Sequence, residues 1–101
     1  MEVFGPIAVR KFVLAKKCET HEMHKHNYDH TTVVFRGSLS VIVGEETHGP
    51  YAEGESVVIK AGVEHTLKAQ EDGTAYWCIF SHRDFDGAVV QIYNGNIEAY
   101  T

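Results

Sequence analysis

The sequence predicts an all-β domain, either a sandwich or a barrel, and three observations support this fold class. Short segments rich in Val, Ile, Phe and Tyr recur along the chain, as is typical of β-strands. Turns built around glycine separate these segments. No segment shows a sustained helical period of apolar residues. Many short strands joined by glycine-rich turns indicate an all-β architecture.

The chain has 101 residues, which is enough for one modest hydrophobic core, so we expect a single domain over residues 1–101. A hydrophobic content of 44% and a charged content of 23% are ordinary for a globular protein and exclude a disordered chain. No apolar run approaches the roughly 20 residues of a membrane-spanning helix. Residues 1–6 lack the basic and apolar pattern of a signal peptide. We therefore expect a cytoplasmic protein with no membrane partner.

The net charge of -5 argues against nucleic acid as a partner, because such proteins need a basic face. The densest basic residues are spread along a predicted strand and beyond it and form no patch: Arg10, Lys11, Lys16 and Lys17. Cys18 and Cys78 occur without a secretory signal, so we expect reduced thiols that act as small apolar fillers.

The first half of the chain carries four predicted strands. Residues 7–15 follow a Gly-Pro break and are rich in Val, Ile and Phe. Residues 20–26 are more polar and carry two histidines. Residues 31–36 are apolar again, and a Gly-Ser turn leads from them into residues 39–43.

Residues 44–50 are predicted as a loop because they consist of turn formers and charged residues. His48 lies inside this loop, so we expect a solvated surface histidine. A strand over residues 56–60 has three apolar residues at its centre. Gly62 permits a turn into the next strand, residues 64–69.

Residues 75–81 form the most apolar predicted strand, with large apolar side chains on both faces. The pattern leaves open which face lines the interior, Tyr76, Cys78 and Phe80 or Trp77 and Ile79. A C-terminal hairpin is predicted over residues 88–100, because Asn-Gly separates two apolar segments there.

Histidines form the feature around which the chain is organised. His24, His26 and His30 lie within seven residues, and His65 is a fourth candidate. On a strand, His24 and His26 point to one face because side chains alternate with period two. Neutral imidazole is a common ligand of transition metals, so the cluster predicts a metal site. An exposed polar strand edge and a merely compositional His-rich tract are the two alternatives.

If the histidines point inward, the other residues on their faces are almost all apolar. This inward set is Thr32, Val34, Leu39, Val41, Val43, Leu67 and Ala69. A small barrel with a metal at one end of an apolar cavity requires such a lining. Val33, Phe35 and Ile42 then face outward, and we expect a homodimer that covers them. Cover by the chain's own tail is the alternative.

Two motifs resemble those of the cupin family. In the first, at residues 24–37, His24-x-His26 is followed after three residues by His30 and after six more by Gly37. The family usually has glutamate where this chain has His30, and it opens the motif with glycine where this chain has Cys18.

The second motif, at residues 54–69, also keeps the family spacing. Gly54 is followed after five residues by Lys60-Ala61-Gly62 and after two more by His65. The family proline is missing at Lys60, and Ala69 replaces the family asparagine.

The resemblance implies a jelly-roll barrel (a double-stranded β-helix) in which His24, His26, His30 and His65 hold one divalent metal. It is similar to the four-histidine subgroup of small single-domain cupins, whose members usually pair as dimers. Manganese and iron are the first candidates, while imidazole ligands also suit nickel, zinc, copper and cobalt. A small-molecule ligand or substrate is the expected partner.

Three functions fit four neutral ligands, which leave the full double charge on the metal. An apolar lining favours a metal-dependent oxygenase, such as a dioxygenase, acting on a small chelating organic molecule. A non-redox isomerase or lyase needs a base, and Glu22 shares the predicted inward face of His24. A non-catalytic binding or sensor protein is the third.

Further residues near the predicted ligands are candidates for contacts with a bound molecule. These are Tyr28, Thr32 and Tyr76. Tyr28 is equally well interpreted as a loop aromatic that covers the mouth of the barrel.

Overall fold

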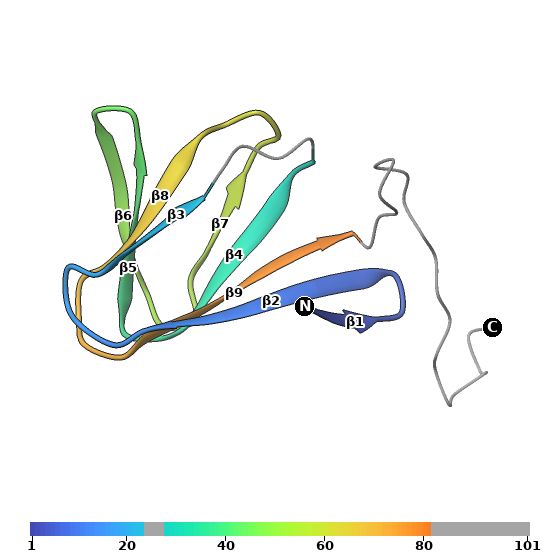
Figure 1. The fold of residues 1–101 in the computed structure, drawn as a ribbon, viewed down its shortest axis with the longest axis horizontal. Helices are drawn as coiled ribbons and strands as arrows, with labels where there is room; N and C mark the ends of the chain where they lie inside the picture. The colour runs from blue at the N-terminus through green and yellow to red at the C-terminus, as the bar shows by residue number, and fades with distance from the viewer. Residues whose placement is uncertain (24–27, 82–101) are drawn as a thin grey trace.

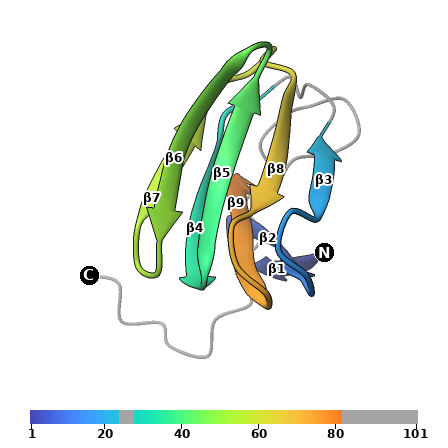
Figure 2. The same ribbon diagram turned by 90° about the vertical axis from the view of Figure 1, so that its left-hand side faces the viewer.

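The computed structural model describes residues 1–23 and 28–81 (Figure 1). These residues form antiparallel strands in two sheets that face each other (Figure 2). One sheet has five strands in the order β1 (Glu2–Phe4), β2 (Ile7–Leu14), β9 (Thr74–Ser81), β4 (His30–Arg36) and β7 (Ser56–Ile59). The other has four strands in the order β3 (Thr20–Met23), β8 (His65–Ala69), β5 (Ser38–Val43) and β6 (Glu46–Ala52). The predicted all-β jelly-roll fold is confirmed.

Seven predicted strands are present, with ends that differ by a few residues at most. The strand expected over residues 20–26 is described as far as Met23. Residues 24–27, with His24 and His26, and the hairpin expected over 88–100 lie outside the described residues. Within the described ranges no helix has the length and apolar character needed to span a membrane.

Two strands differ from the sequence prediction. The loop expected over residues 44–50 is wrong, because β6 covers most of it and pairs with β5. Gly49 and Pro50 suggested a turn, but β6 is the last strand of its sheet, and edge strands tolerate proline because their outer side needs no hydrogen bond. Strand β1, which the sequence did not predict, has three residues and pairs with β2 across the Gly5-Pro6 turn.

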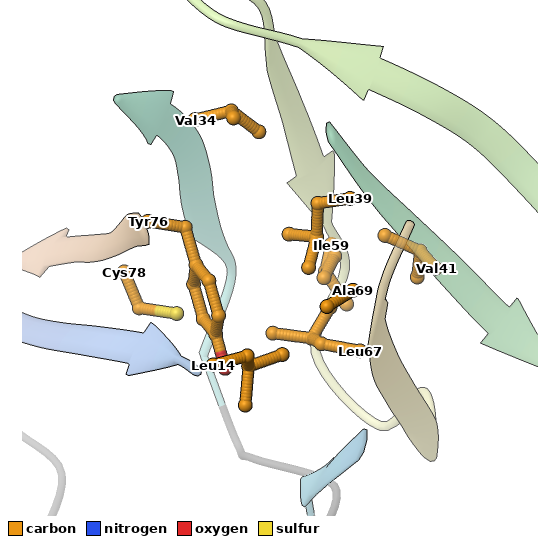
Figure 3. Close-up of a cluster of buried hydrophobic side chains, with 9 residues drawn as sticks. All are labelled: Leu14, Val34, Leu39, Val41, Ile59, Leu67, Ala69, Tyr76 and Cys78. Carbon is orange, nitrogen blue, oxygen red and sulfur yellow. The ribbon is translucent and has the colours of Figure 1, made fainter. Parts of the chain in front are cut away.

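The core lies between the two sheets (Figure 3). Tyr76 and Cys78 project inward from β9 and are 0% and 2% exposed, which settles the inner face of this strand. Across the core from them lie residues of β5 and β8, including Leu39 and Leu67, both fully buried. Trp77 and Ile79 therefore belong to the outer face.

The predicted inward set is confirmed at six positions. Thr32, Val34, Leu39, Val41, Leu67 and Ala69 are buried. Val43 is half-buried and packs against the core. The three residues predicted to face outward do not share one sheet face, because Val33 and Phe35 lie on β4 whereas Ile42 lies on β5, in the other sheet.

Cys18 occupies the position at which the cupin motif opens with glycine. Its φ is 72°, in the left-handed region that glycine adopts at little cost. The Cys18 side chain is exposed, so its prediction as a buried filler is wrong, whereas Cys78 is buried as predicted. The backbone requirement of the motif is therefore retained at residue 18 even though the residue has changed.

Candidate metal centre

His30 and His65 lie together at one end of the barrel. His30 begins β4 and His65 begins β8, so the two imidazoles approach from different sheets. Each residue is 4% exposed, and the ring centroids are 5.3 Å apart. Two imidazoles on one first-row metal ion have centroids roughly 4.5 to 6.5 Å apart, given metal–nitrogen bonds of about 2.1 Å. The observed separation is compatible with shared coordination.

His65 is held in the tautomer that a metal ligand needs. Its Nδ1 lies 2.9 Å from the carbonyl oxygen of Val63, so Nδ1 carries the proton and donates it. Nε2 then has a free lone pair, and among the described residues this buried nitrogen has no hydrogen-bond partner. A metal-ligating histidine typically donates its other ring N–H to a carbonyl in this way. The donor set at this position therefore fits a divalent metal.

His24 and His26, the other two predicted ligands, lie outside the described residues. Residues 1–23 and 28–81 alone contain no group of three or more potential ligands that could hold a metal. The structure thus brings two of the four predicted ligands together. His48, expected to be a surface histidine, is exposed and lies 3.4 Å from the Glu46 carboxylate.

An apolar cavity of about 270 Å³ is lined by chain and strand neighbours of the two histidines, although neither histidine lines it. It lies along β7 and the facing strands β5 and β6, with six of its nine lining residues being valine or isoleucine. Two of its lining residues are Ile59, the strand partner of His30, and Val63, whose carbonyl oxygen accepts the hydrogen bond from His65. Its volume corresponds to about nine water molecules at liquid density, so it suits a small molecule.

His21 is a site residue that the sequence prediction missed. On β3 it pairs with the buried Leu67, so its side chain faces the interior, where its Nδ1 lies 2.7 Å from the Tyr76 hydroxyl. Its ring also packs on Phe12, with centroids 4.4 Å apart. Burial, and secondarily the charge of His65, lowers the pKa of His21 below 6.5.

Glu22 occupies the other face of β3. Its side chain is exposed, so the predicted inward orientation is wrong. A two-residue alternation puts Glu22 on the face of His24 only if strand β3 continues unchanged through residue 24. Strand β3 is described only to Met23, so the two-residue period cannot be carried through residues 24–27. The His21–Leu67 pairing is the signal that sets the register, and only the tertiary structure contains it.

Other polar and aromatic residues line this end of the barrel. The Thr32 hydroxyl lies 3.5 Å from the Cys78 sulfur, and both residues are buried. Burial raises the pKa of the Cys78 thiol, which keeps it neutral. Tyr28, half-buried next to β4, stacks on Phe80 with centroids 4.9 Å apart.

Two facing antiparallel sheets with inward histidines at one end define a small cupin. The cupin domain (Cupin_2) matches residues 11–81, and the chain belongs to this family. No curated protein matches the sequence.

Solved structures show the same fold at low identity. The conserved SPY1581 protein of unknown function from Streptococcus pyogenes is 22% identical, with 82% of this chain and 69% of that chain covered and a TM-score of 0.66. KdgF from Halomonas sp. is 19% identical, with 82% and 76% covered and a TM-score of 0.67. An RmlC-like cupin with a double-stranded β-helix fold from Methanocaldococcus jannaschii is 16% identical, with 74% and 69% covered and a TM-score of 0.62.

Proposed function

We propose that this cupin binds one divalent transition metal, manganese or iron in the first instance, through His24, His26, His30 and His65. The observation that carries the proposal is the hydrogen bonding of the two ring nitrogens of His65. Its Nε2 is buried and lacks a hydrogen-bond partner among the described residues, while Val63 holds the opposite nitrogen. An unsatisfied buried nitrogen costs about 1 to 3 kcal/mol, which a metal bond would offset.

We further propose that the protein is a metal-dependent oxygenase that acts on a small chelating organic molecule. When bound, the metal supplies a Lewis acid that lowers the pKa of a chelating enol or thiol. The chain supplies the surroundings: valines and isoleucines of the adjoining cavity exclude water and accommodate an apolar substrate. Sugars would find few hydrogen-bonding partners on these walls.

A non-redox isomerase or lyase is the second candidate. The lowered pKa of His21, which faces the interior, is the observation that favours it. The lowered pKa leaves His21 neutral near pH 7, as a proton acceptor must be. Its Nδ1 is already bonded to Tyr76, so only Nε2 is available for this role. Glu22, which the sequence suggested as the base, points away from the interior.

The outer face of the five-stranded sheet supports a homodimer. Val13, Phe35 and Val58 lie on this face and are 60%, 43% and 56% exposed. Trp77 and Ile79 extend the same apolar surface between them. Exposed apolar surface of this kind marks protein interfaces, and a second copy of the chain is the partner we propose.

Metal content tests the site directly. Protein purified without added metal, then loaded with manganese(II) or iron(II), is expected to hold one ion per chain. His65→Ala should reduce the occupancy sharply, while His48→Ala, which removes an exposed histidine outside the proposed ligand set, should not. Equal occupancy in the two variants would contradict the site.

Oxygen dependence tests the reaction. Metal-loaded protein is mixed anaerobically with chelating enols, diketones and thiols, and oxygen is then admitted. Oxygen uptake with product formation supports an oxygenase. Turnover without oxygen would leave the isomerase or lyase, and tight binding without any product would leave a sensor.

A further inference from the structure

Arg10 is a cation on the inner face of the barrel to which the proposed function assigns no role. On β2 its strand partner is Cys78, whose own partner on β4 is Thr32. Partners directly across antiparallel strands share a face, and both Cys78 and Thr32 are buried inside. Arg10 is nevertheless exposed, and β2 and β3, which follow one another in the chain, belong to different sheets.

The strand register relates the position of Arg10 to that of His30. Neighbouring strands lie about 4.8 Å apart, so the Cα atoms of Arg10 and Thr32 are separated by roughly 10 Å. Thr32 is two residues from His30 on the same face of β4. An extended arginine side chain bridges part of the separation between β2 and His30. A small substrate can span the part that remains.

The guanidinium of Arg10 lies over one aromatic ring, that of Phe80. It lies 5.8 Å from the centroid of the Phe80 ring, within range of a cation–π contact. Phe80 in turn stacks on Tyr28, two residues before His30. The charge of Arg10 also acts on the interior, since it opposes the effects of burial on the pKa of the Cys78 thiol.

Arg10 has no counter-ion in the described part of the chain. Its neighbour Lys11, on the opposite face, is paired with Glu2 at 3.1 Å and lies over Trp77. Lys60 is paired with Asp29. In a chain of net charge -5, an arginine without a carboxylate partner within residues 1–23 and 28–81 is available to bind an anion.

We propose that Arg10 binds a carboxylate of the substrate, so that the substrate is a small chelating molecule with an anionic group remote from its chelating atoms. This inference rests on the proposed metal site. The chelating end would lie at the histidines and the carboxylate would reach the mouth of the barrel between β2 and β3. Guanidinium and carboxylate match in shape and form paired, charge-assisted hydrogen bonds.

Two diketones that differ only in a carboxylate test the inference. The probes are 4,6-dioxoheptanoate and uncharged heptane-2,4-dione, titrated calorimetrically into manganese(II)-loaded protein. We expect the wild type to bind the carboxylate about tenfold more tightly at low salt, as for a hydrogen bond to a charged group. Arg10→Gln should abolish this preference and leave the affinity for heptane-2,4-dione unchanged. Arg10→Lys should restore part of it.

Lys11→Gln is the matched control, because it removes the same charge one residue away on the opposite face. It should keep the tenfold preference. Equal binding of the two diketones by the wild type, or a preference that survives Arg10→Gln, would overturn the role of Arg10 and leave the metal site standing. Failure of both diketones to bind metal-loaded wild-type protein would instead count against the metal site and against this inference together.

Discussion

The hydroxyl oxygen of Tyr76 lies 2.7 Å from Nδ1 of His21 and joins the two sheets of the barrel. Tyr76 is fully buried on β9 and His21 is half-buried on β3. Burial raises the pKa of Tyr76, so its hydroxyl stays protonated. This hydrogen bond is the one the structure shows for that hydroxyl in the described residues, and its direction depends on the His21 tautomer. When Nδ1 carries the proton and donates it to the Tyr76 oxygen, Nε2 keeps a free lone pair and can accept a proton.

Removing this hydroxyl is expected to destabilise the protein. Tyr76→Phe keeps the ring packing on Phe12 but leaves His21 Nδ1 without its partner, which we expect to lower the free energy of unfolding by about 1 to 2 kcal/mol. Urea denaturation of the metal-free wild type and variant measures this difference in the free energy of unfolding. Tyr51→Phe is the control, since the structure shows no hydrogen bond of the Tyr51 hydroxyl in the described ranges, and it should change stability by much less. Equal losses would contradict the role of the bond.

His21 is expected to make stability depend on pH. Its folded-state pKa is lowered from 6.5, first by burial and then by the charge of His65. Above about pH 7.5, one unit above the ordinary histidine pKa, His21 is almost entirely neutral in both states and contributes little pH dependence. As the pH falls below this value the unfolded chain takes up the proton first, so stability is lost.

The variant His21→Gln removes this titration. Comparison of urea midpoints for metal-free wild type and variant between pH 7.5 and 5 should show a smaller decrease for the variant. Parallel curves would show that His21 does not contribute.

Gly37 is expected to be intolerant of a side chain for two reasons. Its φ is +80°, and a Cβ at this position would lie 2.6 Å from the Thr74 hydroxyl oxygen and 3.0 Å from the Thr74 Cα. Gly37→Ala should therefore lower stability by about 2 to 4 kcal/mol, from backbone strain and overpacking together.

Gly54→Ala separates the two costs. Gly54 has a similar φ of +86°, but no described atom beyond its chain neighbours lies within 4 Å of the place that a Cβ would occupy. We expect a loss of about 1 to 2 kcal/mol from the backbone alone. Thermal or urea unfolding of both variants would give equal losses if the contact with Thr74 were unimportant.

If the protein is a dimer, a charged residue introduced on the outer face of the five-stranded sheet should lower the molecular mass of the particle in solution. Phe35 packs on Trp77 with ring centroids 4.2 Å apart and is 43% exposed. Phe35→Glu would bury a charge at the interface and should give a monomer by light scattering at micromolar concentration. Thr47→Glu, exposed on the other sheet, should leave the dimer intact. A wild-type protein that is already monomeric would exclude the dimer.

The fold and part of the candidate site follow from the sequence because their signals are local. Apolar alternation and glycine turns predicted the strands that hold His30 and His65, and the motif spacing pointed to these two histidines before the structure placed them 5.3 Å apart. The left-handed backbone at Cys18 and Gly37 also agrees with motif positions that favour glycine. Each of these features depends only on residues close together in the chain.

The remaining features depend on which strands pair, and an alternating pattern does not contain that information. Residues 75–81 are apolar on both faces, so only the pairing of β9 with β2 and β4 turned Tyr76 inward and Trp77 outward. The register of β3 against β8 placed His21 inside and Glu22 outside, opposite to the sequence prediction. Arg10 became a candidate anion site only when β2 was set beside Cys78, because a charged residue in an apolar strand has the same sequence pattern whether it faces solvent or a cavity.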